Sequence, residues 1–150
     1  MLLVLPVAGC AMLAGLPPRI PACAGALVPT QQLGSDFVAR ERFSLTHADR
    51  SVHLDLVLQK RDNVLVLIGF DPLGAKLFTV VQRGSETEVD AAPAAILAVP
   101  PLNVLRDVHR ARFNAPTDAE VTTSAGETRI RNPCCQSETR LSRVSEKGLP

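Results

Sequence analysis

Residues 52–70 contain the pattern that most constrains the fold of this chain. Every second residue from Val52 to Leu58 is apolar, and the residues between them are mostly polar. A period of two is typical of a β-strand that buries one face. After a polar stretch at residues 60–63, residues 64–70 form a continuous apolar run, VLVLIGF. A short apolar run of this kind is typical of a strand that is buried on both faces or lines a cavity with one of them.

The flanking segments extend this hairpin into a sheet. Residues 37–45 alternate roughly, and residues 76–82 follow the turn Asp71-Pro72-Leu73-Gly74, where proline suits the second turn position. Residues 86–90 are short and polar, which is typical of an edge strand. We therefore predict four or five antiparallel strands between residues 37 and 90.

The pattern changes between residues 91 and 113. Residues 91–97 fit a loop or a short helix. The pair Pro100-Pro101 then suits a helix start, because proline in the first turn loses no needed hydrogen bond. Apolar residues recur at helical spacing from Leu102 onward. We predict a helix near residues 101–113, which packs on the sheet or covers its open mouth.

The first 18 residues carry no charged side chain and read as an export signal. A spanning helix needs about 20 apolar residues, whereas prolines and glycines interrupt this segment. The run Val7, Ala8, Gly9 and Cys10 resembles a bacterial lipobox, in which small residues admit the peptidase and the cysteine thiol receives a diacylglyceryl group. We predict a signal peptide over residues 1–9, lipid attachment at Cys10, and an anchor and proline-rich tether over residues 10–33.

This N-terminus also predicts where the protein resides. Acyl chains on Cys10 would hold it on a membrane, because each buried CH₂ group contributes about 0.8 kcal/mol. By resemblance to other lipoproteins, Ala11 suits sorting to the outer membrane, with the domain facing the periplasm. The alternative is ordinary cleavage at Ala22-Cys23-Ala24, which would leave a soluble periplasmic protein.

The C-terminal part of the chain has a different composition. Residues 114–150 are rich in Thr, Ser, Glu and Arg, and their apolar residues are scattered singly. We expect a polar, poorly packed segment, with Cys134 and Cys135 as an exposed pair within it. Neighbouring cysteines seldom bridge each other, and the chain has no C-x-x-C pair of the kind that binds zinc.

Composition and motifs exclude several function classes. The net charge is only +1, and there is no Trp or Tyr, so we expect no nucleic-acid partner. There is no phosphate-binding glycine loop and no nucleophile motif. We therefore expect no catalytic residues, no metal site and no cofactor. A remote alternative is a small exported hydrolase or metal-binding protein that uses His53 and Asp55, two residues apart on one strand face.

The block 65–80, LVLIGFDPLGAKLFTV, resembles the central motif of a proteobacterial lipoprotein family of unknown function, domain-of-unknown-function family 3261. The segment 96–113 is similar to the helix of that family, so the resemblance covers about residues 37–113, and the sequence departs from it afterwards. The family is in turn similar to the periplasmic lipoprotein carrier and outer-membrane lipoprotein receptor of the lipoprotein-localisation pathway.

The resemblance implies a mainly β fold with an α-helix. It would be an antiparallel curved sheet, an incomplete half-barrel, over residues 34–113, with a covering helix. The apolar concave face would shelter acyl chains, and the function would be binding or relaying acyl chains or lipoproteins. The candidate cavity-lining residues are Leu54, Leu56, Leu58, Leu65, Leu67, Phe70 and Leu77. Alternatively, these side chains form a filled core, and the protein is a structural or adaptor lipoprotein that docks a protein partner.

Overall fold

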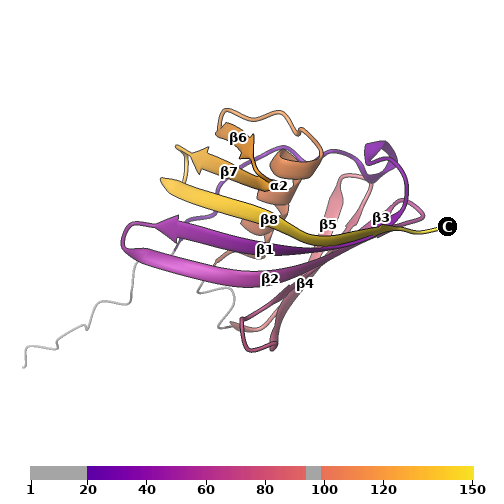
Figure 1. Ribbon diagram of the computed structural model, residues 1–150, viewed down its shortest axis with the longest axis horizontal. Coiled ribbons are helices and arrows are strands. Elements are labelled where there is room, and N and C mark those ends of the chain that lie inside the picture. Colours follow the sequence, from indigo (N-terminus) through magenta and orange to yellow (C-terminus); the bar gives the residue numbers. More distant parts are fainter. Residues whose placement is uncertain (1–19, 94–98) are drawn as a thin grey trace, which may run out of the picture.

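The computed structural model describes residues 20–93 and 99–150 of the chain. It contains one sheet, one α-helix and a short 3₁₀ helix within these residues (Figure 1). The predicted lipobox (Val7, Ala8, Gly9) and Cys10 lie outside the described residues. The elements are η1 (Thr30–Gln32), β1 (Phe37–His47), β2 (Arg50–Arg61), β3 (Val64–Phe70), β4 (Lys76–Arg83), β5 (Glu86–Ala91), α2 (Pro101–Arg112), β6 (Glu120–Ser124), β7 (Glu127–Asn132) and β8 (Ser137–Gly148).

All eight strands belong to one antiparallel sheet with the order β5-β4-β3-β2-β1-β8-β7-β6. The sheet does not close, because β5 and β6 form its two edges. It curves around α2, so that the helix lies on the concave face (Figure 1). The predicted mainly β class, with an antiparallel half-barrel and a helix near residues 101–113, is confirmed.

The first five strands follow one another through short turns, as the alternating pattern predicts. The β2–β3 turn uses Asp62 and Asn63, both with positive φ, a conformation that matches the twist of a two-residue hairpin. Along β2, the even-numbered residues from Leu54 to Lys60 are buried and the odd-numbered ones point to the convex face. Gly69 of β3 lies opposite Phe78 of β4, and a Cβ at this position would lie 2.4 Å from the Phe78 ring. Glycine is therefore required where this aromatic ring packs.

The prediction of a poorly packed segment over residues 114–150 is wrong. Residues 120–148 form three strands, and β8 pairs with β1 along its whole length in the middle of the sheet. The inward-facing side chains of β7 and β8 alternate like those of the other strands, but most of them are polar: Thr128, Asn132, Ser137 and Thr139 are buried beside Ile130 and Leu141. A polar inward face removed the hydrophobic signal without removing the strand.

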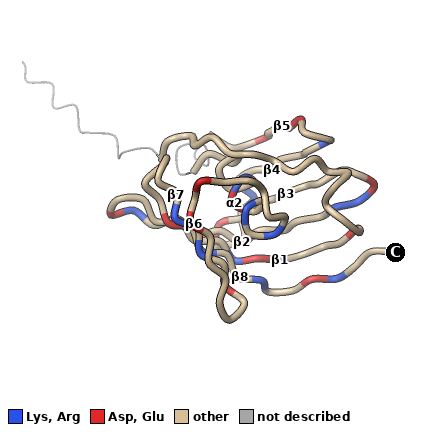
Figure 2. Tube along the Cα trace, turned by 90° about the horizontal axis from the view of Figure 1, so that it is seen from above, with Lys and Arg blue, Asp and Glu red and all other residues tan. Residues whose placement is uncertain are grey.

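The helix covers the concave face and reaches towards both ends of the sheet. It contacts β4 and β5 on one side and β7 and β8 on the other. It begins after Pro100, whose backbone is extended, and ends at Arg112, which is followed by the C-cap Phe113 and by Asn114 with a φ of +51°. Seen from above, α2 lies within the curve of the sheet, between β3–β5 on one side and β1, β2 and β8 on the other, and basic and acidic residues are interspersed along the trace (Figure 2). Among the described residues, α2 is the longest helix, and none is long and apolar enough to cross a membrane.

Candidate functional site

The candidate site is the contact between α2 and the concave face of the sheet. Val104, Leu105 and Val108 of the helix have at most 1% of their surface exposed, and they belong to the same apolar cluster as the inward-facing leucines of the sheet. The helix has its apolar residues at i, i+1 and i+4, so one stripe points at the sheet. The contact between α2 and the sheet therefore contains both the predicted cavity-lining leucines and the main apolar core of the protein.

The structure brings five of the seven predicted cavity-lining residues together. They lie on the concave face of β2 and β3 and are buried: Leu54, Leu56, Leu58, Leu65 and Leu67. Leu77 is half-buried at the irregularity where β4 pairs with the end of β3, and it packs against the edge of the cluster. Phe70 lies opposite Asp55 and lines a groove of the convex face with Arg40 and Val57, so its assignment to the concave cavity is wrong.

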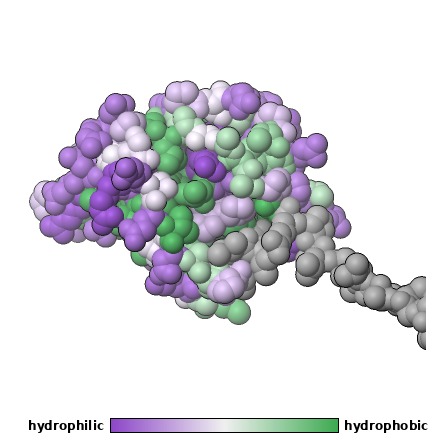
Figure 3. All heavy atoms as spheres, turned by 180° about the vertical axis from the view of Figure 1, so that it is seen from behind, coloured by the Kyte–Doolittle hydropathy of each residue, from purple (hydrophilic) through white to green (hydrophobic). Residues whose placement is uncertain are grey.

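These leucines form a packed core in the conformation described. Leu58, Leu65 and Leu67 have no exposed surface, and they belong to one packed cluster with the apolar residues of α2. An acyl chain can reach these side chains only when part of the covering structure moves. Seen from behind, apolar side chains also reach the surface in a band between polar groups (Figure 3). Val89 of the edge strand β5 is among the apolar side chains that are exposed to solvent.

Residues 20–33 form the second part of the cover, which we call the strap. The prediction of a proline-rich tether over residues 10–33 is wrong for residues 20–33, because Ile20, Cys23, Thr30 and Leu33 are buried. The strap is fastened to α2 through its backbone. Asn103 accepts a hydrogen bond from the Cys23 N–H at 3.0 Å and donates one to the Pro21 carbonyl at 2.8 Å. Backbone bonds to side chains are not visible as hydrophobic periodicity, so the sequence pattern did not indicate them.

His109 joins the helix, the strap and β4. Its Nδ1 accepts the N–H of Val28 at 3.0 Å, so Nε2 carries the proton and donates to Gln82 Oε1 at 2.8 Å. Gln82 in turn donates to the carbonyls of Val28 and Gly84. Burial lowers the pKa of His109 from its ordinary 6.5 to about 4, because the charged ring would be desolvated. The neutral ring is therefore a structural link at neutral pH.

A buried acid–base group joins α2 to β8. Arg110 Nη1 donates to Asp107 Oδ1 at 2.7 Å, and the Thr139 hydroxyl donates to Asp107 Oδ2 at 2.6 Å. Burial raises the pKa of Asp107, while the hydrogen bonds from Thr139 and Arg110 act in the opposite direction. Arg110 also donates to the carbonyl of Ala24 in the strap. This one group thus connects the helix, the strap and the C-terminal part of the sheet.

The C-terminal end of α2 has its own ionic contacts. Arg112 donates to Glu41 of β1 and to Glu146 of β8. Its guanidinium lies 4.7 Å from the centre of the Phe37 ring. Glu41 Oε2 and Arg112 Nε are buried without a hydrogen-bond partner among the described residues. A buried polar atom without a hydrogen bond costs free energy. The hydrogen-bonding atoms of Glu41 and Arg112 are thus less completely paired than the two ring nitrogens of His109.

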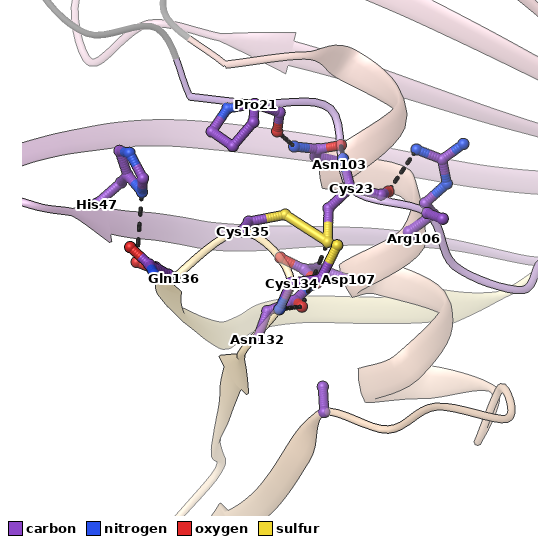
Figure 4. The surroundings of a disulfide bond; sticks show 12 residues. Pro21, Cys23, His47, Asn103, Arg106, Asp107, Asn132, Cys134, Cys135 and Gln136 are labelled. Atoms are coloured by element: carbon purple, nitrogen blue, oxygen red, sulfur yellow. Dashed lines mark hydrogen bonds between the residues drawn. A yellow bond between two sulfur atoms is a disulfide. The ribbon is translucent and has the colours of Figure 1, made fainter.

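The strap is also linked covalently to the C-terminal strands. Cys23 and Cys135 form a disulfide between the strap and the β7–β8 turn, with 5.6 Å between their Cα atoms (Figure 4). The prediction of Cys134 and Cys135 as an exposed pair is therefore wrong for Cys135, which is buried, while Cys134 is exposed and free. The separation of 112 residues explains why no local spacing indicated the bond.

The alternative site at His53 and Asp55 receives little support from its surroundings. Both side chains line a groove on the convex face with Arg42 and Arg140, away from the covered side of the sheet. Within residues 20–93 and 99–150, the one cluster of three potential metal ligands consists of Cys23, Cys134 and Cys135. A metal site at His53 would need further ligands from outside the described residues.

Comparison with known families gives one match. Residues 38–147 match the model of a family described as Protein of unknown function (DUF3261). The chain belongs to this family. The match to DUF3261 runs from β1 to β8, so the expectation that the sequence departs from the family after Phe113 is wrong. A search of curated proteins finds no match to the chain.

Proposed function

We propose that this DUF3261 protein is a non-enzymatic exported lipoprotein, anchored through Cys10, that binds or relays acyl chains or lipoproteins at the periplasmic face of the outer membrane. The observation that carries the proposal is the unclosed sheet whose leucine-rich concave face is covered by one helix and a strap. Because the helix and strap contribute no strand to the sheet, they can move without breaking its strand pairing.

The free energy that the apolar side chains of α2 gain by covering the sheet is comparable to the free energy that an acyl chain would gain in the same place. Full burial of three apolar side chains such as Val104, Leu105 and Val108 contributes about 5–8 kcal/mol. An acyl chain that buries about ten CH₂ groups gains about 8 kcal/mol. A chain entering the concavity therefore offsets the loss of the apolar contacts of α2. Release then needs only a competing site, with no covalent step.

The disulfide supports export and the assignment of the anchor. Disulfides persist in oxidising compartments such as the bacterial periplasm. Cleavage at Ala22-Cys23-Ala24 would separate Cys23 from the domain and remove its bond to Cys135. Processing before Cys10 keeps the strap whole, so the geometry favours lipid attachment over the soluble alternative.

A second candidate function is a structural or adaptor lipoprotein that docks a protein partner. The complete burial of Leu58, Leu65 and Leu67 favours it, because a filled core needs no ligand. The two functions differ in whether the concave face ever opens.

Native mass spectrometry of the full chain, exported in a Gram-negative host, separates these candidates. We expect a co-purifying acyl lipid that is lost on denaturation and that exchanges with an added fatty acid. A folded protein that stays free of lipid and binds no fatty acid would contradict acyl-chain binding and favour the adaptor.

Anchoring is tested separately with Cys10→Ala. We expect this variant to lose incorporation of labelled acyl chains and to leave the outer-membrane fraction. Unchanged membrane attachment would contradict the anchor. Leu73→Ser is a matched control, since Leu73 is 95% exposed on the β3–β4 turn and contributes nothing to the core.

A further inference from the structure

The three described cysteines meet at one place in the fold. The sulfur atoms of Cys23, Cys134 and Cys135 all lie within 4.8 Å of one another, where the strap passes the β7–β8 turn (Figure 4). Cys23 and Cys135 are 2% and 3% exposed, whereas Cys134 is exposed. The chain thus has a buried disulfide with a free, accessible thiol beside it.

We propose that Cys134 is a thiol-exchange site, through which an external thiol gains access to the buried disulfide and becomes covalently attached to the protein. Thiol–disulfide exchange proceeds by attack of a thiolate on a disulfide sulfur. An external thiol cannot reach Cys23 or Cys135 directly in the folded protein, because both are covered. Cys134 satisfies both requirements, since it is exposed to solvent and adjacent to both sulfurs.

The first step is internal and conserves the number of disulfides. The Cys134 thiolate attacks Sγ of Cys23, the Cys23–Cys135 bond breaks, and Cys135 leaves as a thiolate that takes up the proton released by Cys134. The link to the strap moves by one residue, from Cys135 to Cys134. Both residues lie in the same turn between Asn132 and Ser137, so the rearrangement is confined to that turn.

The second step uses the external thiol. Its thiolate attacks Sγ of Cys134, which is now the accessible half of the disulfide, and Cys23 leaves as a thiolate. The product is a mixed disulfide at Cys134, with Cys23 and Cys135 as thiols. The strap then keeps its hydrogen bonds to Asn103 and His109 but loses its covalent link to the β7–β8 turn.

A polar contact to Asn132 holds the backbone of Cys134 next to Cys23. Asn132 Oδ1 accepts the Cys134 N–H at 3.2 Å and lies 3.3 Å from Cys23 Sγ. One side chain at the end of β7 thus lies against both the attacking residue and the sulfur that it attacks. The proposal does not depend on acyl-chain binding, so its failure would leave the proposed function untouched.

The test uses the full chain with Cys10→Ser, so that only these three cysteines remain, and glutathione as the thiol. In the parent chain we expect a glutathione adduct at Cys134, located by peptide mapping under non-reducing conditions. With Cys134→Ser we expect the buried disulfide to react at least about tenfold more slowly, because local opening must come first. Equal rates for the parent and Cys134→Ser would overturn the proposal.

Cys135→Ser provides the matched second variant. Its neighbouring cysteine remains, and we expect a Cys23–Cys134 disulfide to form, because the three sulfurs are within reach of one another. A folded Cys135→Ser protein without this link would also overturn the proposal. Should Cys135→Ser fail to fold, the comparison of the parent with Cys134→Ser decides, since that variant keeps the Cys23–Cys135 bond.

Discussion

The two parts of the sheet bury different kinds of side chain under the same helix. The concave face of β2 and β3 presents leucines, whereas the concave face of β7 and β8 presents Thr128, Asn132, Ser137 and Thr139 among few apolar residues. The first part is stabilised by apolar burial. The second is linked to its cover through the hydrogen bond from Thr139 to Asp107 and through the Cys23–Cys135 disulfide. One continuous sheet can therefore be stabilised by non-directional apolar packing in one part and by a specific hydrogen bond and a disulfide in the other.

The largest expected effect is in the apolar part. Leu67→Ala removes a side chain with no exposed surface, and we expect a loss of about 3–5 kcal/mol in the free energy of unfolding, because transfer and cavity terms add. Urea denaturation measures this loss. Leu73→Ser on the exposed turn should change the stability by less than about 0.5 kcal/mol. Equal losses for the two variants would show that apolar burial does not distinguish this part.

The second effect concerns the covalent link. Cys23→Ser removes a bond that closes a segment of 112 residues, and we expect a loss of about 2–4 kcal/mol. The parent chain should show the same loss when it is unfolded in a reducing agent, and the Leu67→Ala loss should be similar with and without reductant. Insensitivity of the parent chain to reductant would contradict a stabilising role for the disulfide.

The third effect is a pH dependence at the junction of the two parts. The pKa of His109 is lowered to about 4 in the folded protein, so the unfolded chain binds a proton first as the pH falls. Stability contributed by the neutral ring is complete above pH 6.5 and is lost between pH 6.5 and 4, by up to about 3 kcal/mol. The raised pKa of Asp107 acts in the opposite direction.

Thermal unfolding across this pH range, with His109→Gln as the control, measures the effect. We expect the variant to be less stable at pH 7 and to show a flatter pH profile than the parent chain. A parent profile that is as flat as that of His109→Gln would show that the ring is not the responsible group.

The smallest effect is in the polar part. Thr139→Val keeps the shape of the side chain but removes the hydroxyl that donates to Asp107 Oδ2. We expect a loss of about 1–3 kcal/mol, since a buried carboxylate oxygen loses its donor. Denaturation of Thr139→Val, of Asp107→Asn and of the double variant gives the coupling between the two side chains. Strictly additive losses would show that Thr139 and Asp107 are not coupled, and that their hydrogen bond does not stabilise this part of the sheet.

The same difference explains what the sequence could and could not predict. Alternation in β2 and the apolar run of β3 predicted the hairpin, the neighbouring strands and the helix, because burial leaves a periodic trace. Strands β6–β8 left no such trace, since their inward positions are largely polar. Five leucines of the candidate site were identified, but the strap, the His109–Gln82 link and the disulfide were not. These depend on backbone groups and on residues more than 25 positions apart, which no local pattern records.

The pairing of β1 with β8 sets an order of events during folding. The first strand of the sheet has one neighbour, β2, as soon as the hairpin forms, but its other edge stays unpaired until residues 137–148 are available. Contacts this far apart in sequence slow folding, and an unpaired strand edge can pair with another chain. We therefore expect slow refolding, and aggregation that increases with protein concentration, whenever β8 is withheld from β1.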